Sequence, residues 1–61
     1  MWTPIYMAQS LNIAIRIKQM LEQNDILVYV RPAKTNGECY DLLVPRAELE
    51  EAQGLIFANF S

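Results

Sequence analysis

The sequence contains no histidine and a single cysteine, Cys39. Without histidine, the chain lacks the commonest general base and metal ligand. One cysteine can form neither an intrachain disulfide nor a zinc site of cysteine and histidine ligands, and a Cys-His or Ser-His nucleophile would need residues from another chain. We therefore expect no metal site, no cofactor and no enzymatic activity. We interpret Cys39 as a surface or half-buried thiol without a redox role, as is typical of the reducing cytosol.

The sequence also lacks clusters of positive charge and long apolar runs. The net charge is −2, and the five cations are scattered: Arg16, Lys18, Arg31, Lys34 and Arg46. Nucleic-acid-binding proteins show a clustered basic surface, and anionic membranes attract the same feature. No apolar run approaches the ~18 residues of a membrane span, and the segment MWTPIYMAQS lacks the charged and apolar regions of a signal peptide. We expect a soluble, cytoplasmic protein with neither nucleic-acid nor membrane partners.

The chain has 61 residues, of which 52% are apolar, a composition that indicates a folded protein and a single domain over residues 1–61. A domain of this size buries only about 60% of the surface that its unfolded chain exposes. Small domains often gain stability by self-association, so we expect a homo-oligomer.

The first half of the chain predicts a strand followed by a helix. Trp2 to Ala8 is rich in β-forming residues, and Pro4 indicates that this strand is short or lies at a sheet edge. Ser10 is suited to cap a helix that runs to about Asn24. One stripe of the helix is apolar and predicts its buried face: Ile13, Ala14, Ile17, Met20 and Leu21. Leu11 and Ile15 lie beside that stripe and are a candidate oligomer contact.

The middle of the chain predicts a hairpin of strands 26–33 and 39–44. A two-residue Asn36-Gly37 turn would place Val30 opposite Leu43. A three-residue loop with Gly37 in the left-handed region places Val30 opposite Leu42 instead. This second register makes one face wholly apolar and pairs Arg31 with Asp41 and Lys34 with Glu38, so we favour it.

A second helix is predicted after Pro45, which suits a first helical turn. We expect this helix to end at about Phe57. The alternative is a helix that ends at Gly54, followed by a fourth strand LIFANF. Three carboxylates lie near the predicted start: Glu48, Glu50 and Glu51. We interpret them as solvated charges that favour the helix N-terminus, in preference to a site for a hard cation.

The resulting order is β-α-β-β-α, an α+β fold. A right-handed crossover leaves room for the third strand between the first two, antiparallel to both, with both helices on one face of this antiparallel-type mixed sheet. The open face is the main candidate interaction surface, with Leu27, Tyr29, Arg31, Asp41 and Leu43. For Trp2, Tyr6 and Tyr40 we favour core and interface packing over the stacking of RNA bases.

Four segments carry a family resemblance: MWTPIYMA, AIRIKQMLEQND, ILVYVRPA and LLVPRAELEEA. They resemble a family of short bacterial signal-transducing proteins that share a βαββα unit of the PII-like, ferredoxin-like type. A closer set from Gram-positive anaerobes opens with the same Met-Trp-Thr and carries the Val-Arg-Pro of residues 30–32. Pro4 and Gly54 depart from the family, which has an aliphatic residue and a helix-forming residue at these places. The resemblance implies the ferredoxin-like (PII-like) fold and a role in signal transduction.

Some of these similar proteins carry the name glutamate decarboxylase. Such an enzyme needs a lysine that forms a Schiff base with pyridoxal phosphate and partners for the phosphate. This chain offers only Lys18 and Lys34 and has no glycine-rich phosphate loop. We therefore expect a non-catalytic regulatory or interaction module that self-associates and binds an unknown protein or small molecule through its open sheet face or a free edge. The alternative is a small-molecule-binding domain whose pocket forms between subunits.

Overall fold

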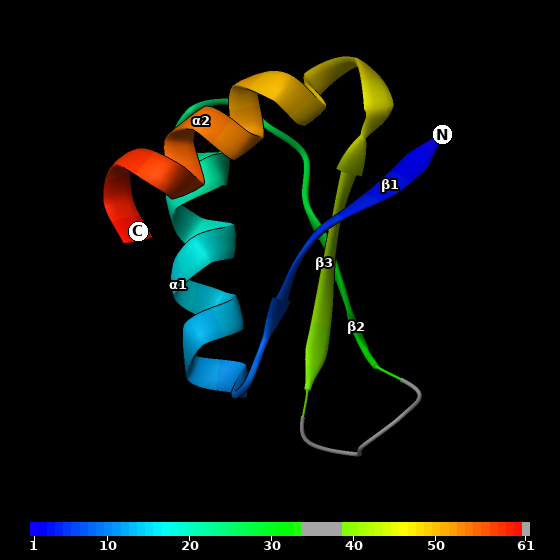
Figure 1. Ribbon diagram of the computed structural model, residues 1–61, viewed down its shortest axis with the longest axis vertical. Coiled ribbons are helices and arrows are strands. Elements are labelled where there is room, and N and C mark those ends of the chain that lie inside the picture. The colour runs from blue at the N-terminus through cyan, green and yellow to red at the C-terminus, as the bar shows by residue number, and fades with distance from the viewer. Residues whose placement is uncertain (34–38, 61) are drawn as a thin grey trace.

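The computed structural model describes residues 1–33 and 39–60 and has the predicted βαββα order (Figure 1). Its elements are β1 (Trp2–Ala8), α1 (Leu11–Glu22), β2 (Tyr29–Pro32), β3 (Tyr40–Pro45), the short 3₁₀ helix η1 (Arg46–Glu48) and α2 (Leu49–Phe60). The predicted three-residue loop and the Lys34–Glu38 pair lie outside the described residues.

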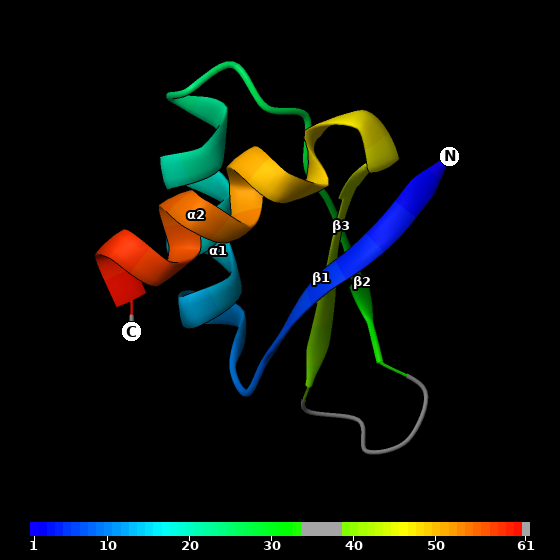
Figure 2. The ribbon, with the colours of Figure 1, turned by 45° about the horizontal axis from the view of Figure 1, so that its top comes forward.

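The three strands form a sheet of order β1-β3-β2, with β3 antiparallel to both neighbours. Both helices lie on one side of this sheet, and none of the described elements covers the other side (Figures 1 and 2). The prediction of a central third strand and of two helices on one face is therefore confirmed. The result is an α+β fold that is compatible with the ferredoxin-like arrangement.

Helix α1 is bounded by local signals at both ends. The Ser10 hydroxyl accepts a hydrogen bond from the Ile13 N–H at 3.2 Å and so caps the first turn. At the other end, Asp25 has a φ of 64°, in the left-handed region. Its N–H donates to the Glu22 carbonyl, and the Ile26 N–H donates to the Leu21 carbonyl. These two bonds form a Schellman motif, which stops the helix slightly before the predicted end.

The hairpin register is the predicted one, with Val30 opposite Leu42 and Arg31 opposite Asp41. However, β2 begins only at Tyr29, not at residue 26 as predicted. The Ala33 N–H donates to the Cys39 carbonyl, and bonded pairs recur at every second residue of an antiparallel ladder. The next bonded pair after Tyr29 and Leu43 would therefore join residue 27 to Pro45, which has no N–H to donate.

A β-bulge interrupts β1. Pro4 lies opposite Leu43 and Tyr6 lies opposite Leu42, so that Ile5 has no partner of its own in β3. Ile5 packs against the core on the helix side of the sheet. Tyr6 lies opposite the buried Leu42 and therefore faces the same side. Two consecutive residues thus point to the helix side, which a regular strand would not allow.

The core lies between the inner face of the sheet and the two helices. Its largest fully buried side chains are Ile17, Leu21, Ile26, Leu42 and Val44. Most of the predicted α1 stripe is buried or half-buried in this core. The exception is Ile13, which is 39% exposed. The apolar stripe is wider than the part of α1 that packs against the core, and this part is centred on Ala14 and Ile17.

Helix α2 continues through Gly54 and ends at Phe60. The favoured prediction of a helix that continues past Gly54 is therefore confirmed. The helix extends three residues beyond the predicted end at Phe57, and the alternative strand LIFANF is not formed. Ala52 and Ile56 are buried against the core on either side of Gly54 in sequence, and this packing outweighs the cost of a glycine inside a helix, about 1 kcal/mol.

Candidate interaction surfaces

The open face of the sheet combines residues from all three strands. Opposed residues of an antiparallel ladder share a face, so the register of the strand pairs assigns the members of this face directly. They are Trp2, Pro4 and Met7 from β1, Asp41, Leu43 and Pro45 from β3, and Tyr29 and Arg31 from β2. Leu27 precedes β2 at a position that alternation places on the same face. We call these nine residues the open face.

Apolar side chains dominate this open face. Trp2, Met7, Leu27 and Tyr29 are between 49% and 66% exposed. Together they form an apolar surface that the described elements leave uncovered. Large exposed apolar patches on soluble proteins mark sites of interaction.

Two aromatic rings cover the centre of the open face. The rings of Trp2 and Tyr29 lie with centroids 6.0 Å apart and planes tilted by 48°, a favourable arrangement for an aromatic pair. Leu43 lies on the strand between them and is only 3% exposed. The prediction that Leu43 offers a contact surface is therefore wrong.

Arg31 and Asp41 form the predicted cross-strand pair at one end of the open face. Their closest atoms, Nε and Oδ2, are 3.9 Å apart, and both side chains keep contact with solvent. A single long contact of this kind contributes about 0–1 kcal/mol to stability. The pair therefore contributes charge to the open face more than it holds the hairpin together.

The other two predicted contact residues, Leu11 and Ile15, lie on α1 and so belong to the opposite side of the sheet from the open face. Both are exposed. They lie on the same side of α1 as the ion pair between Lys18 Nζ and Glu22 Oε2, which are 2.9 Å apart, and precede it along the helix. The structure thus separates the predicted site residues into two surfaces.

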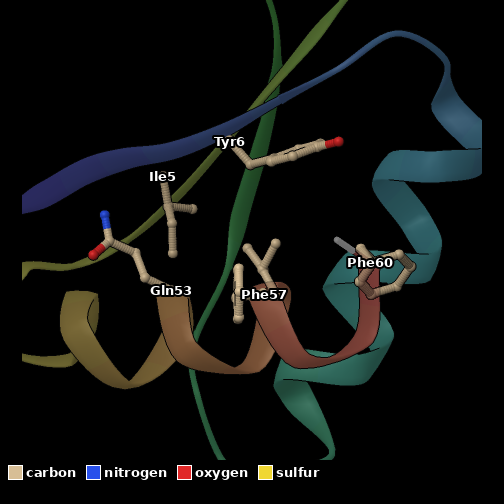
Figure 3. Close-up of a pocket in the computed structure, with 6 residues that line it drawn as sticks. Ile5, Tyr6, Gln53, Phe57 and Phe60 are labelled. Atoms are coloured by element: carbon tan, nitrogen blue, oxygen red, sulfur yellow. The ribbon is translucent and has the colours of Figure 1, made fainter.

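A second apolar surface is a groove between β1 and α2, shown in Figure 3. It has a volume of about 260 Å³ and is lined by Ile5, Tyr6, Gln53, Ile56, Phe57 and Phe60. The β-bulge supplies the two residues from β1, and the i, i+3 spacing of Phe57 and Phe60 places both rings along one side of α2. Phe57 is 73% exposed, so the groove is open to solvent on that side.

Proline limits pairing at the free edge of β1. The Arg46 N–H donates to the Met1 carbonyl at 2.9 Å, which makes residue 1 a bonded position of the ladder with β3. Alternation then directs the backbone of Thr3 towards β3 and the backbone of Pro4 towards the open edge. Because proline has no N–H, that edge lacks a donor at Pro4, next to the place where the bulge distorts the strand.

The free edge of β2 is limited in the same way. The Ala33 N–H donates to the Cys39 carbonyl at 2.8 Å, so odd-numbered residues of β2 bond to β3 and Pro32 faces outwards. Each outer edge of the sheet therefore carries a proline where an added strand would need a donor.

The chemically reactive groups do not gather in the described part of the chain. Residues 1–33 and 39–60 contain no group of three or more histidine, cysteine or acidic residues that could hold a metal ion. Cys39 is half-buried and not in a disulfide. Glu50 and Glu51 are exposed in the first turn of α2, whereas Oε1 of Glu48 is buried without a hydrogen-bond partner in the described structure.

Sequence reasoning missed the outward position of Trp2 and Met7 and the whole groove. Two signals bear on them. Pro4 in a strand indicates an edge and favours irregular pairing, and the bulge next to it sets which residues of β1 face outwards. Phe57 and Phe60 also lie beside the buried stripe of α2, where a fully packed helix would carry polar residues.

Neither helix among the described residues combines the length and apolarity that crossing a bilayer requires. Comparison of the chain with protein-family models, curated proteins and solved structures gave no match.

Proposed function

We propose that this chain is a non-catalytic interaction module that self-associates and serves a regulatory role in the cytoplasm. The observation that carries the proposal is the open face, where four large apolar side chains are about half exposed on the side of the sheet that no described element covers. Removing these side chains from water gains about 25 cal/mol per Å² of apolar area. A domain of this size has a small core, so association would add substantially to its stability.

The experiment is native mass spectrometry together with sedimentation velocity, from nanomolar to high micromolar concentrations. A monomer at low concentration that converts to one defined oligomer at high concentration supports the proposal. A monomer at every concentration overturns it. Extra mass retained on the oligomer would identify a bound small molecule.

The non-catalytic part of the proposal rests on the absence of histidine and on the position of Lys18. Lys18 lies on the surface of α1, paired with Glu22, and does not line the groove between β1 and α2, so no pocket in the described part of the chain would enclose a cofactor bound to it. Addition of pyridoxal phosphate should give no internal aldimine absorbance, and borohydride should fix no cofactor to the chain. A band that borohydride converts to a stable lysine adduct would revive the decarboxylase activity.

The groove between β1 and α2 favours a second candidate function, the binding of a small apolar molecule. Its walls are mostly apolar, and it carries two polar groups, the Tyr6 hydroxyl and the Gln53 amide. Phe57 leaves one side open, so a second subunit could complete the pocket. A saturable rise in melting temperature with a neutral naphthalene probe, lost in Phe57→Ala, supports this function. A rise of equal size in that variant contradicts it.

A further inference from the structure

We propose that the open face binds the open face of a second copy of this chain, in a two-fold dimer where Arg31 of each copy lies against Asp41 of the other. This inference rests on the proposed self-association and specifies its surface and geometry. Pairing of the sheet edges is another route to a dimer of this fold, and Pro4 and Pro32 remove a donor from each edge. Face-to-face packing of two sheets needs no such donors.

The apolar centre of the open face is already ordered in one chain. The rings of Trp2 and Tyr29 lie with centroids 6.0 Å apart, and Leu43, which is opposite Tyr29 on β3, is buried. Binding usually requires the ordering of exposed side chains, which opposes association. Two rings that hold each other in place reduce this entropic loss. Aromatic residues at the centre of a patch are also the commonest source of binding energy in interfaces.

The charges of the open face are self-complementary. The face carries one cation and one anion, Arg31 and Asp41, and the intrachain contact between them is long at 3.9 Å. Each group therefore retains capacity for a second partner. In a two-fold interface residue i contacts residue j and residue j contacts residue i. A second copy can therefore satisfy both charges at once, whereas a strongly acidic or basic partner would be repelled by one of them.

The available area is sufficient for a dimer. Half-exposed aromatic and long side chains offer on the order of 100 Å² each, so the exposed members of the open face together offer on the order of 600 Å² per chain. The two chains would bury about 1,200 Å², the lower limit of standard-size interfaces. This size predicts a dimer of moderate affinity that dissociates on dilution.

The test reverses the two charges one at a time. Arg31→Asp makes the open face doubly negative, and Asp41→Arg makes it doubly positive. In a two-fold dimer each variant brings like charges together twice, so each should weaken its own dimer by about tenfold or more. An equimolar mixture of the two variants brings opposite charges together twice and should form a heterodimer at least as tight as the original dimer. The unequal masses of the two variants make this heterodimer directly visible by native mass spectrometry.

A matched pair of variants locates the apolar part of the interface. Tyr29→Glu places a charge at the centre of the open face, and Phe57→Glu places the same charge in the groove, at an aromatic residue that is at least as exposed. Circular dichroism would first verify that both variants are folded. We expect Tyr29→Glu to be monomeric and Phe57→Glu to dimerise normally.

The outcomes separate this inference from the function on which it rests. An original chain that is monomeric at every concentration overturns the self-association itself. An original chain that dimerises, with both charge variants dimerising equally well, overturns the open-face dimer and leaves self-association standing. Loss of the dimer in Phe57→Glu alone also overturns it and assigns the interface to the groove.

Discussion

Asp25 holds a backbone conformation that proteins usually assign to glycine. Its φ of 64° lies in the left-handed region, where the Cβ atom of an L-residue crowds the backbone and costs roughly 1–2 kcal/mol. Aspartate tolerates this region better than most residues. The conformation is needed because the Schellman motif ends α1 here and directs Ile26 into the core.

The substitution Asp25→Gly should therefore stabilise the chain. Relief of the crowding is partly offset by the greater backbone freedom of glycine in the unfolded state, and we expect a net gain of about 0.5–1 kcal/mol in the free energy of unfolding. Urea unfolding at low protein concentration measures this gain. Asp25→Ala is the control and should lose stability. If Asp25→Gly were the less stable variant, the aspartate side chain would have to make a stabilising interaction of its own.

Gly54 presents the opposite case, a glycine inside a helix. A Cβ atom added at this position would meet no other atom within 4 Å. Gly54→Ala should therefore raise the free energy of unfolding by about 1 kcal/mol, which corresponds to a rise of about 4–8 °C in melting temperature for a domain of this size. Ala58→Gly, at another exposed position of α2, should give a loss of similar size. A destabilising Gly54→Ala would mean that another chain approaches this face of α2 closely.

At the scale of the elements, proline on each of the two outer strands opposes edge-to-edge pairing with another chain. Pro4→Val or Pro32→Val would restore an N–H group on an exposed edge and add β propensity. We expect each variant to form larger, concentration-dependent assemblies, detected by light scattering and by a rise in β-sheet absorbance in the infrared. Pro45→Val is the control, because its restored N–H would face β2 inside the sheet. Equal aggregation of the control would show that proline acts through general stability.

The elements also show what the sequence alone can predict. Helix α1, the central position of β3 and the Arg31–Asp41 register follow from local periodicity and from matching one apolar face to another. The start of β2 does not, because it depends on a missing donor in Pro45 of another strand. The β-bulge at Ile5 was equally hidden: it changes which residues of β1 face the helices, and tertiary packing selects it.

The candidate surfaces were predicted only in part for the same reason. Alternation placed Tyr29 and Leu43 on one face correctly, but it does not show that Leu43 is buried or that Trp2 packs against Tyr29. That contact depends on which residues of β1 face outwards, and the β-bulge at Ile5 determines this. The groove needs the juxtaposition of β1 with α2, two elements far apart in the sequence.

At the scale of the whole molecule, stability depends on one small core. Folded proteins have about 0.05–0.15 kcal/mol of stability per residue, or about 3–9 kcal/mol for this chain. Leu42 lies fully buried on the central strand, and Leu42→Ala should lose about 2–5 kcal/mol. We expect this variant to be largely unfolded near 37 °C by circular dichroism. Leu27→Ala removes the same atoms from an exposed position and, at a concentration where the chain is monomeric, should change stability by less than about 0.5 kcal/mol.

The strand order has a consequence for the time course of folding during synthesis. β1 leaves the ribosome first, yet its partner β3 is made only after α1 and β2 are complete. α1 and the β2–β3 hairpin form from near neighbours in the chain within microseconds, while the first strand must wait for the last. During that interval Trp2 and Met7 are exposed on an unpaired strand, the state in which nascent chains aggregate. Pro4 therefore protects the unfinished chain as well as the finished sheet. A strand that lacks the N–H group of residue 4 pairs poorly with the strands of other chains that are being made on the same messenger RNA.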